Sequence, residues 1–145
     1  MTAVAYMLGR ICIPIVFIVA GVQKLLNVAQ VARDLAATNI PLPDEISAYL
    51  GGMPKYQALG YLVGAVELIC GLMVLLGLKA RWGALVLVAF TVVATVFFHN
   101  FWDMTGDARV QNQVHALKNL AILGGLLLVV AGGSRGTSVD GRPRA

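Results

Sequence analysis

Residues 57–78 read QALGYLVGAVELICGLMVLLGL, and this stretch decides the fold class. It is a continuous apolar run that contains one ionisable acid, Glu67. About 20 helical residues rise about 30 Å, which is the thickness of the hydrocarbon core of a bilayer. Lipid offers no hydrogen bonds to the backbone, so a run of this kind must bond within itself as a helix. We therefore predict a transmembrane helix here.

Three further runs have the same character. They cover about residues 3–26, broken by Arg10, residues 82–98, with no charge, and residues 114–132, broken by Lys118. A membrane barrel would need short alternating segments instead of continuous runs. For the first run a cleaved signal peptide is the alternative, because Arg10 precedes an apolar stretch and small residues. The four runs predict an all-α membrane protein, a single domain over residues 1–132 with four transmembrane helices in a compact bundle.

Composition supports a bilayer as the main partner of the chain. Of 145 residues, 59% are hydrophobic and 12% are charged, and the mean hydropathy is +0.81. Globular domains have about 45–50% apolar and about 25% charged residues. The net charge of +4 is spread between the apolar runs instead of lying in one basic patch. These values exclude a disordered chain, a nucleic-acid-binding domain and a secreted disulfide scaffold.

The segments outside the four runs suggest an orientation. Lys79 and Arg81 stand in one tight turn, and more arginines follow in the Gly-rich tail at residues 133–145. Short loops rich in Lys and Arg stay in the cytoplasm. We therefore predict that both termini lie in the cytoplasm and that the tail there is disordered. The long connection at residues 27–56 is expected to form short amphipathic helices on the outer surface.

Each run carries one stripe of small or polar residues, which marks the side facing other helices. On the first run the stripe includes Phe17 and Gly21. Arg10, Glu67 and Lys118 also stand on the stripes, and with Asn119 beside Lys118 they form a predicted buried polar network. Charges inside a membrane are costly and usually paired. We expect Glu67 to pair with Arg10, and Lys118 to pair with Glu67 or with Asn119 and a water. One interpretation is a relay or ligand site with more cations than acids, and the other is a network that only fixes helix register.

A second polar cluster lies at the predicted outer ends of the helices. Its members form the candidate mouth of the site: Lys24, His99, Trp102, Asp103 and His115. Histidine titrates near neutral pH and could move protons there. The alternative is an interfacial belt of anchoring residues. The spacing matches no metal-ligand pattern, so we predict no metal site. Cys12 and Cys70 are interpreted as small apolar residues, because helical geometry turns Cys12 away from the interior.

Four motifs together resemble the DoxX-like family of small bacterial membrane proteins. They are AGVQKL at residues 20–25, GAVELICG at residues 64–71, HNFW at residues 99–102 and LKNLAILGG at residues 117–125, after an early Arg10. Their order and spacing make the resemblance specific over about residues 5–131.

The resemblance implies a four-span protein of the bacterial plasma membrane that acts as a membrane subunit or quinone-interacting component of a redox or oxidative-stress system. It makes a quinone the candidate cofactor and a redox protein a candidate partner. A second copy of the chain is the other candidate partner, because four helices give thin cover to a polar interior. No flavin, haem or iron–sulfur motif stands in the sequence, so electrons would come from a partner or a diffusible quinone. The alternative function is a non-catalytic membrane module or small-solute carrier whose buried charges are structural, and whether the chain is an enzyme stays open.

Overall fold

The computed structural model describes residues 2–38, 40–134 and 138–139. Within this part of the chain all regular structure is helical. The elements are α1 (Thr2–Leu26), α2 (Val28–Ala37), α3 (Ile46–Tyr49), α4 (Lys55–Leu76), α5 (Ala80–Phe98), the 3-10 helix η1 (Phe101–Asp103) and α6 (Gly106–Gly132). Helices α1, α4, α5 and α6 are long and apolar enough to cross a membrane. The predicted all-α fold with four spans and short helices after the first span is confirmed. Most of the predicted tail lies outside the described residues.

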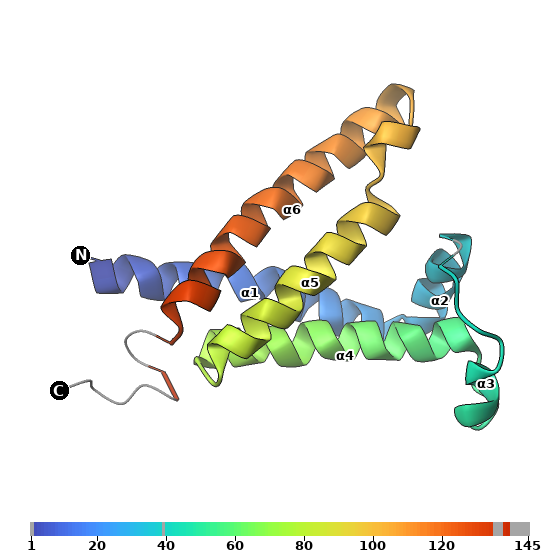
Figure 1. Cartoon of the computed structure of the whole chain (residues 1–145), viewed down its shortest axis with the longest axis horizontal. Helices are drawn as coiled ribbons and strands as arrows, with labels where there is room; N and C mark the ends of the chain where they lie inside the picture. The colour runs from blue at the N-terminus through green and yellow to red at the C-terminus, as the bar shows by residue number, and fades with distance from the viewer. Residues whose placement is uncertain (1, 39, 135–137, 140–145) are drawn as a thin grey trace.

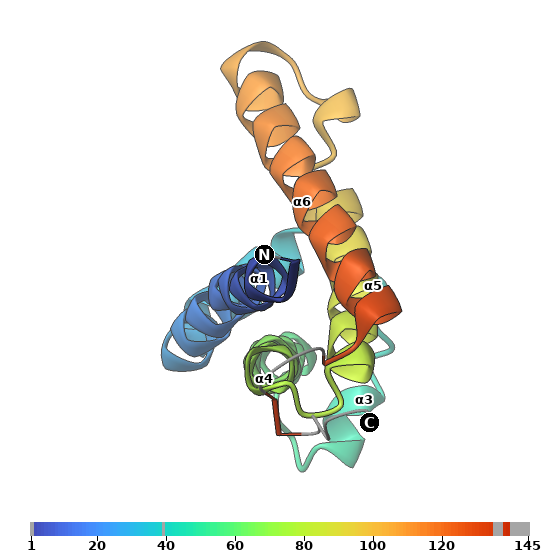
Figure 2. The same ribbon diagram turned by 90° about the vertical axis from the view of Figure 1, so that its left-hand side faces the viewer.

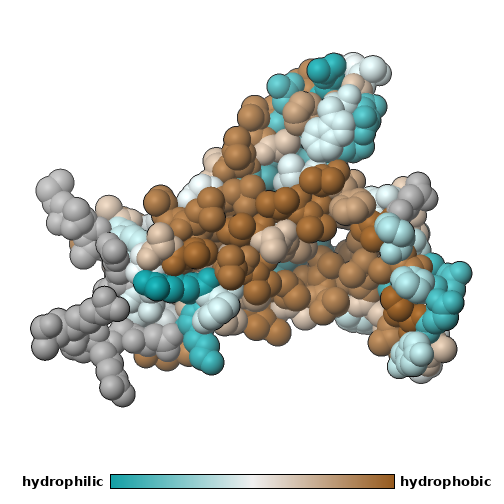
Figure 3. Space-filling model, in the orientation of Figure 1, coloured by the Kyte–Doolittle hydropathy of each residue, from teal (hydrophilic) through white to brown (hydrophobic). Residues whose placement is uncertain are grey.

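Helix α6 begins at Gly106, well before the predicted start of the fourth span at residue 114. Its first turns carry charged and amide side chains such as Arg109 and Gln111, which are exposed. A helix does not have to end where the hydrocarbon ends, because polar side chains can be hydrated beyond it. Figure 3 shows this division: hydrophobic surface covers the middle of the molecule, and hydrophilic surface gathers around α2 and α3 and at the tip of the α5 and α6 hairpin.

Helices α1 and α4 form a close antiparallel pair (Figure 1). Gly21 allows the close approach: a Cβ at this position would lie 2.7 Å from the backbone nitrogen of Leu68 and 2.8 Å from the carbonyl oxygen of Gly64. Farther along the pair, Gly71 lies against Pro14 and Ile18 in the same way. The small residues that the sequence placed on one stripe of each helix therefore form this contact, as is usual for membrane helices.

Helices α5 and α6 form a second antiparallel pair, which diverges from the first pair toward the end of the molecule that carries α2 (Figures 1 and 2). We call this the α2 end, and the end where α1 begins and α6 ends the termini end. At the termini end the pairs are tied together: the hydroxyl of Tyr6 donates to the carbonyl of Gly133 at 2.5 Å, and Arg81 donates to the carbonyl of Ala131 at 3.3 Å. The apolar core lies on the same side of the molecule, with Val74, Leu87 and Leu126 fully buried. The predicted bundle is therefore compact at the termini end and open at the α2 end.

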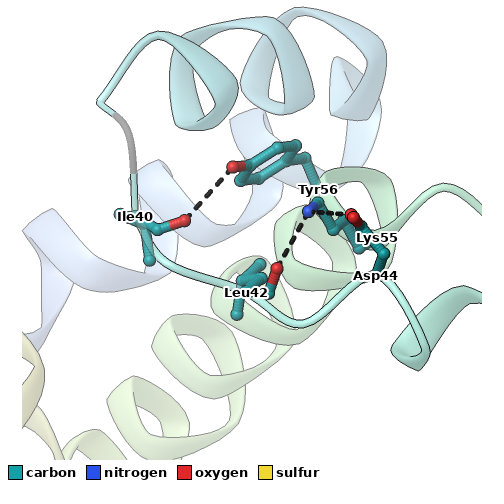
Figure 4. A network of polar contacts seen from close by, with 5 residues as sticks. All are labelled: Ile40, Leu42, Asp44, Lys55 and Tyr56. Atoms are coloured by element: carbon teal, nitrogen blue, oxygen red, sulfur yellow. Dashed lines mark hydrogen bonds and ion pairs between the residues drawn. The ribbon is translucent and has the colours of Figure 1, made fainter.

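The segment between α1 and α4 folds back over α4. Leu35 of α2 is buried, and Val28 and Val31 lie over Gly60 of α4. Residues 40–44, which we call the strap, are tied to the start of α4 (Figure 4). Tyr56 donates to the carbonyl of Ile40 at 3.1 Å, and Lys55 donates to the carbonyl of Leu42 at 2.8 Å and contacts the carboxylate of Asp44 at 2.5 Å. The hydrogen bond from Lys55 and its positive charge lower the pKa of Asp44 below its usual value.

Candidate ligand site

A cavity of about 630 Å³ lies between the two helix pairs. Its floor is the contact of Phe17 on α1 with Phe90 on α5, whose rings meet edge to face with centroids 6.4 Å apart. Its roof consists of apolar side chains from α2 and the strap: Val31, Leu35, Ile40 and Leu42. Most of the lining is apolar, and the polar members are Lys24, Asp34, Glu67, Thr91, His99 and Asn119. The site is therefore an apolar chamber with a small polar set.

The central polar feature is an ion pair between Lys24 of α1 and Glu67 of α4. The ammonium nitrogen lies 2.6 Å from Oε2 of Glu67, and 4% of the Glu67 side chain is exposed against 30% for Lys24. Helix geometry explains the pairing, because every Cα–Cβ bond leans toward the N-terminus of its helix. In an antiparallel pair, Lys24 on α1 leans toward the termini end and Glu67 on α4 leans toward the α2 end. The two side chains therefore converge.

The same lean carries Arg10 away from Glu67, so the predicted pairing of these two residues is replaced by the pair with Lys24. Arg10 is buried, and its guanidinium lies against Gly77, where α4 ends. Gly77 is ten residues along the chain from Glu67, which corresponds to about 15 Å of helix. A cation at a helix C-terminus is favourable because the last carbonyls carry partial negative charge. Depth along the helix alone, which suggested the pairing, does not include the direction of the side chain.

The predicted role of Lys118 is also corrected. Its side chain is exposed, whereas Asn119 beside it is half-buried and donates to the hydroxyl of Thr95 on α5 at 2.9 Å. In turn Thr95 donates to the carbonyl of Thr91 at 2.7 Å. The expected excess of cations around Glu67 is therefore absent among the described residues, and one cation faces one acid.

Two of the five candidate mouth residues line the cavity, namely Lys24 and His99. The ring of His99 stacks on the ring of His115, with centroids 5.0 Å apart and planes 15° from parallel, and its Nδ1 lies 3.0 Å from Oδ1 of Asn112. His115 itself is exposed. Trp102 and Asp103 are exposed in η1, outside the cavity lining, where Asp103 accepts a hydrogen bond from Asn100 at 3.3 Å.

Sequence reasoning missed Asp34 and Phe90, whereas it placed Phe17 on the inward stripe of the first run. Asp34 stands on the polar face of α2 and accepts a hydrogen bond from Gln30 at 2.8 Å, which resembles an ordinary surface contact. Its place in the lining depends on how α2 folds back over α4. Phe90 belongs to an apolar run in which nothing marks the helix that each residue will face, so the contact between Phe90 and Phe17 was not predicted.

The described residues include no group of three or more His, Cys, Asp or Glu side chains that could hold a metal ion. The polar set can do other chemistry. The ammonium of Lys24 and the amide of Asn119 can donate hydrogen bonds to a neutral or anionic oxygen. Because Nδ1 of His99 donates to Oδ1 of Asn112, its Nε2 can accept a hydrogen bond from a hydroxyl group. The carboxylate of Glu67 can accept one.

Comparison with known proteins assigns the chain to a family. The DoxX family profile matches residues 5–100. The chain is 27% identical to the inner membrane protein YphA of Escherichia coli over 139 residues, which cover 96% of this chain and 90% of that protein. It is 30% identical to the inner membrane protein YqjF of Escherichia coli over 140 residues, which cover 94% and 90%. No solved structure matches the chain significantly. With the profile covering most of its spans, this four-helix chain belongs to the DoxX family.

Proposed function

We propose that this DoxX protein is a quinone-interacting membrane component of a redox or oxidative-stress system. The observation that carries the proposal is the apolar cavity with an ion pair in its wall. Sites for small molecules are typically clefts of about 300–1,000 Å³ with mostly apolar walls and a few placed polar groups. The volume and lining of this cavity fit that description. The bacterial inner membrane is the proposed location, because both relatives are inner membrane proteins.

The polar set suits the chemistry of a quinone head. Reduction of a quinone to a hydroquinone takes up two electrons and two protons at its two oxygens. Lys24 would donate a hydrogen bond to one of these oxygens, and a donor aimed at an oxygen where negative charge develops stabilises that charge. Nε2 of His99 would accept a hydrogen bond from the hydroxyl formed at the other oxygen. Glu67 would accept a proton on the return reaction, while Lys24 holds its carboxylate in place. His115, which is exposed, stacks on His99 and would hold its ring in position.

Partners follow from the same proposal. No flavin, haem or iron–sulfur motif stands in the sequence, so a redox protein would supply or remove the electrons. The basic turn at Lys79 and Arg81 supports cytoplasmic termini by the positive-inside rule. A second copy of the chain is the other candidate partner, and it would pack on exposed apolar residues away from the opening, such as Leu120 and Leu128 of α6.

A second candidate function is a non-catalytic membrane module or carrier. The one-to-one pairing of Lys24 with Glu67 favours it, because this pair joins α1 to α4 and a compensated ion pair has a structural use. In that case the charges would hold the helices together, and the cavity would bind nothing through them.

Quinone extraction tests the choice. Protein purified from bacterial membranes in mild detergent would be extracted with solvent, and the quinone bound per chain measured by chromatography. We expect the wild-type protein to retain quinone. When a decyl-tailed quinone is titrated back, Lys24→Gln and Lys24→Gln/Glu67→Gln should bind it with about tenfold lower affinity. This factor corresponds to the loss of one charged hydrogen bond.

The matched control is Lys118→Gln, which removes an exposed lysine outside the cavity lining and is expected to leave binding unchanged. The double variant removes both charges, so it separates a lost ligand contact from a buried unpaired charge. Wild-type protein that binds no quinone, with variants that differ only in stability, would favour the structural function.

A further inference from the structure

The cavity has a polar part and an open apolar side. Lys24, Glu67 and His99 contribute ionisable groups. The members of the lining that are exposed include Val16 on α1 and Val93 and Phe97 on α5. These side chains are both exposed and apolar, and they stand on helices that cross the membrane, so they face lipid.

The opening follows from the course of α1 and α5. They touch at the floor, through Phe17 and Phe90, and diverge from there toward the α2 end (Figure 1). Val16 is ten residues before the end of α1, or about 15 Å of helix, and Val93 is five residues before the end of α5, or about 8 Å. Half of a bilayer's hydrocarbon core is about 15 Å thick. The gap therefore lies within the acyl chains of the leaflet at the α2 end.

The aqueous side of the cavity is covered instead. On this side Leu35 of α2 is a buried member of the cavity lining, and the strap adds Ile40 and Leu42 to the roof. The bonds from Lys55 and Tyr56 hold the strap against α4 (Figure 4). A ligand that came directly from water would have to displace this tied segment, whereas a ligand dissolved in the leaflet meets an opening.

We propose that the cavity takes its ligand sideways from the lipid, through the gap between α1 and α5, and that the ligand is an amphiphile with a hydrogen-bonding head and one flexible hydrocarbon tail. The head lies against Lys24, Glu67 and His99, and the tail passes between Val16 and Val93 into the acyl chains. This inference rests on the proposed function for the quinone as ligand. Its geometric content, the route and the tail, holds for any amphiphile of this class.

The chain offers closely matched variants. Val16 is 47% exposed and its neighbour Ile15 is 48% exposed, but only Val16 lines the cavity. Likewise Val93 is 54% exposed and lines the cavity, whereas Val92 is 45% exposed and lies outside the lining. Val16→Trp and Val93→Trp would obstruct the gap with an indole ring, and Ile15→Trp and Val92→Trp would place the same ring elsewhere in lipid.

Photolabelling of the full chain in vesicles of phosphatidylethanolamine and phosphatidylglycerol tests the inference. Two probes carry a diazirine on the tail, one with a quinone head and one a fatty acid, and excess unlabelled compound defines specific labelling. We expect specific labels on residues 16–20 of α1 and 93–97 of α5. Val16→Trp and Val93→Trp should lower them about tenfold, while Ile15→Trp and Val92→Trp leave them unchanged. A tail-less quinone head should bind all five proteins alike.

Every outcome decides between the two ideas. Specific labelling by the fatty acid and not by the quinone would keep the route and reject the quinone function. Specific labelling by the quinone probe, with or without labelling by the fatty acid, supports both the lateral route and the quinone function. Specific labels confined to the strap, labels insensitive to all four tryptophans, no specific labels with either probe, or cross-linked dimers across Val16 and Val93 would each overturn the lateral route. Gel filtration of each variant establishes that it is folded.

Discussion

Glu67 shows how the direction of a side chain, as well as its depth, selects a partner inside a membrane. An isolated charge at the centre of a helix costs about 2.5–3.5 kcal/mol on insertion scales. The carboxylate is almost fully buried, whereas the ammonium of Lys24 keeps part of its surface open. Loss of Lys24 should therefore cost more than loss of Glu67. An unpaired Lys24 can be hydrated, whereas an unpaired Glu67 carboxylate stays buried.

The first prediction concerns this pair and the free energy of unfolding. Lys24→Gln leaves a buried carboxylate without its cation and should destabilise the protein by about 3 kcal/mol, within the range for broken buried pairs. Glu67→Gln should cost less, because Lys24 is partly hydrated, and Lys24→Gln/Glu67→Gln should be closer to wild type than Lys24→Gln. Unfolding in mixed micelles with increasing dodecyl sulfate, followed by circular dichroism, measures the three values.

A polar residue outside the pair serves as the control for this cycle. His99→Ala removes a contact with Asn112 in a half-buried position, which should cost about 1 kcal/mol. Additive single and double variants would show that Lys24 and Glu67 do not interact energetically, and equal folded yields of Glu67→Ala and His99→Ala would contradict the buried pairing.

At the scale of elements, the close approach of α1 and α4 depends on glycine, as the small-residue stripes predicted. The position of Gly21 leaves no room for a Cβ, because the nearest atoms belong to the backbone of α4 and cannot turn aside. Gly124 on α6 has open space around it instead. The two glycines stand in similar apolar sequence, and only the packing distinguishes them.

The second prediction compares these glycines. Gly21→Ala should push α1 from α4 and cost about 1–3 kcal/mol, as overpacking usually does. Gly124→Ala should be neutral or stabilise by about 0.5–1 kcal/mol, since alanine favours helix over glycine. Folded yield and unfolding in mixed micelles check both. Equal stabilities would show that α1 and α4 can separate without cost.

The third prediction concerns the strap and pH. Its hydrogen bond with Lys55 lowers the pKa of Asp44 in the folded protein, so this contact stabilises the strap fully above the usual aspartate pKa of about 4. The stabilisation is lost as pH falls through the lower folded pKa. A spin label at Ala48→Cys, in a background without the native cysteines, should become more mobile as pH is lowered below about 4.

In the same background, the Asp44→Asn substitution should make the spin label at position 48 as mobile at neutral pH as it is in the unsubstituted strap in acid. Lowering the pH should then change its mobility little. The bond from Lys55 to the carbonyl of Leu42 persists in both forms, so the strap loosens without detaching. A mobility that responds to acid equally in both proteins would assign the effect to another group.

At the scale of the whole molecule, the four spans form two antiparallel pairs that join at one end. The core and the ties of Tyr6 and Arg81 close the termini end, and the cavity lies toward the open end. This shape gives a small chain a polar site inside the membrane without enclosing it. The start of α1 and the end of α6 lie at the same end of the molecule, so the chain crosses the membrane an even number of times.

The fourth prediction tests this topology. In a cysteine-free background, Leu78→Cys in the turn between α4 and α5 and Ala48→Cys in α3 should lie on opposite sides of the membrane. A membrane-impermeant maleimide should label Ala48→Cys in spheroplasts and Leu78→Cys in inverted vesicles, if the termini are cytoplasmic. The reversed pattern would place the termini outside, and labelling of both from one side would contradict four spans.

What followed from the amino-acid order alone was the number of spans, the helical class, the short helices after the first span and the family. These depend on local quantities: run length, backbone bonding in lipid, and the small residues of each stripe. The partner of Glu67 and the contact of Phe17 with Phe90 depended on how the helices face one another. Arg10, Lys24 and Lys118 look alike along the chain as lone cations in apolar runs. The tertiary structure decided which of them meets the acid. The antiparallel packing of α1 with α4 turns Lys24 toward Glu67 and Arg10 toward Gly77. The divergence of α5 and α6 from that pair leaves Lys118 exposed.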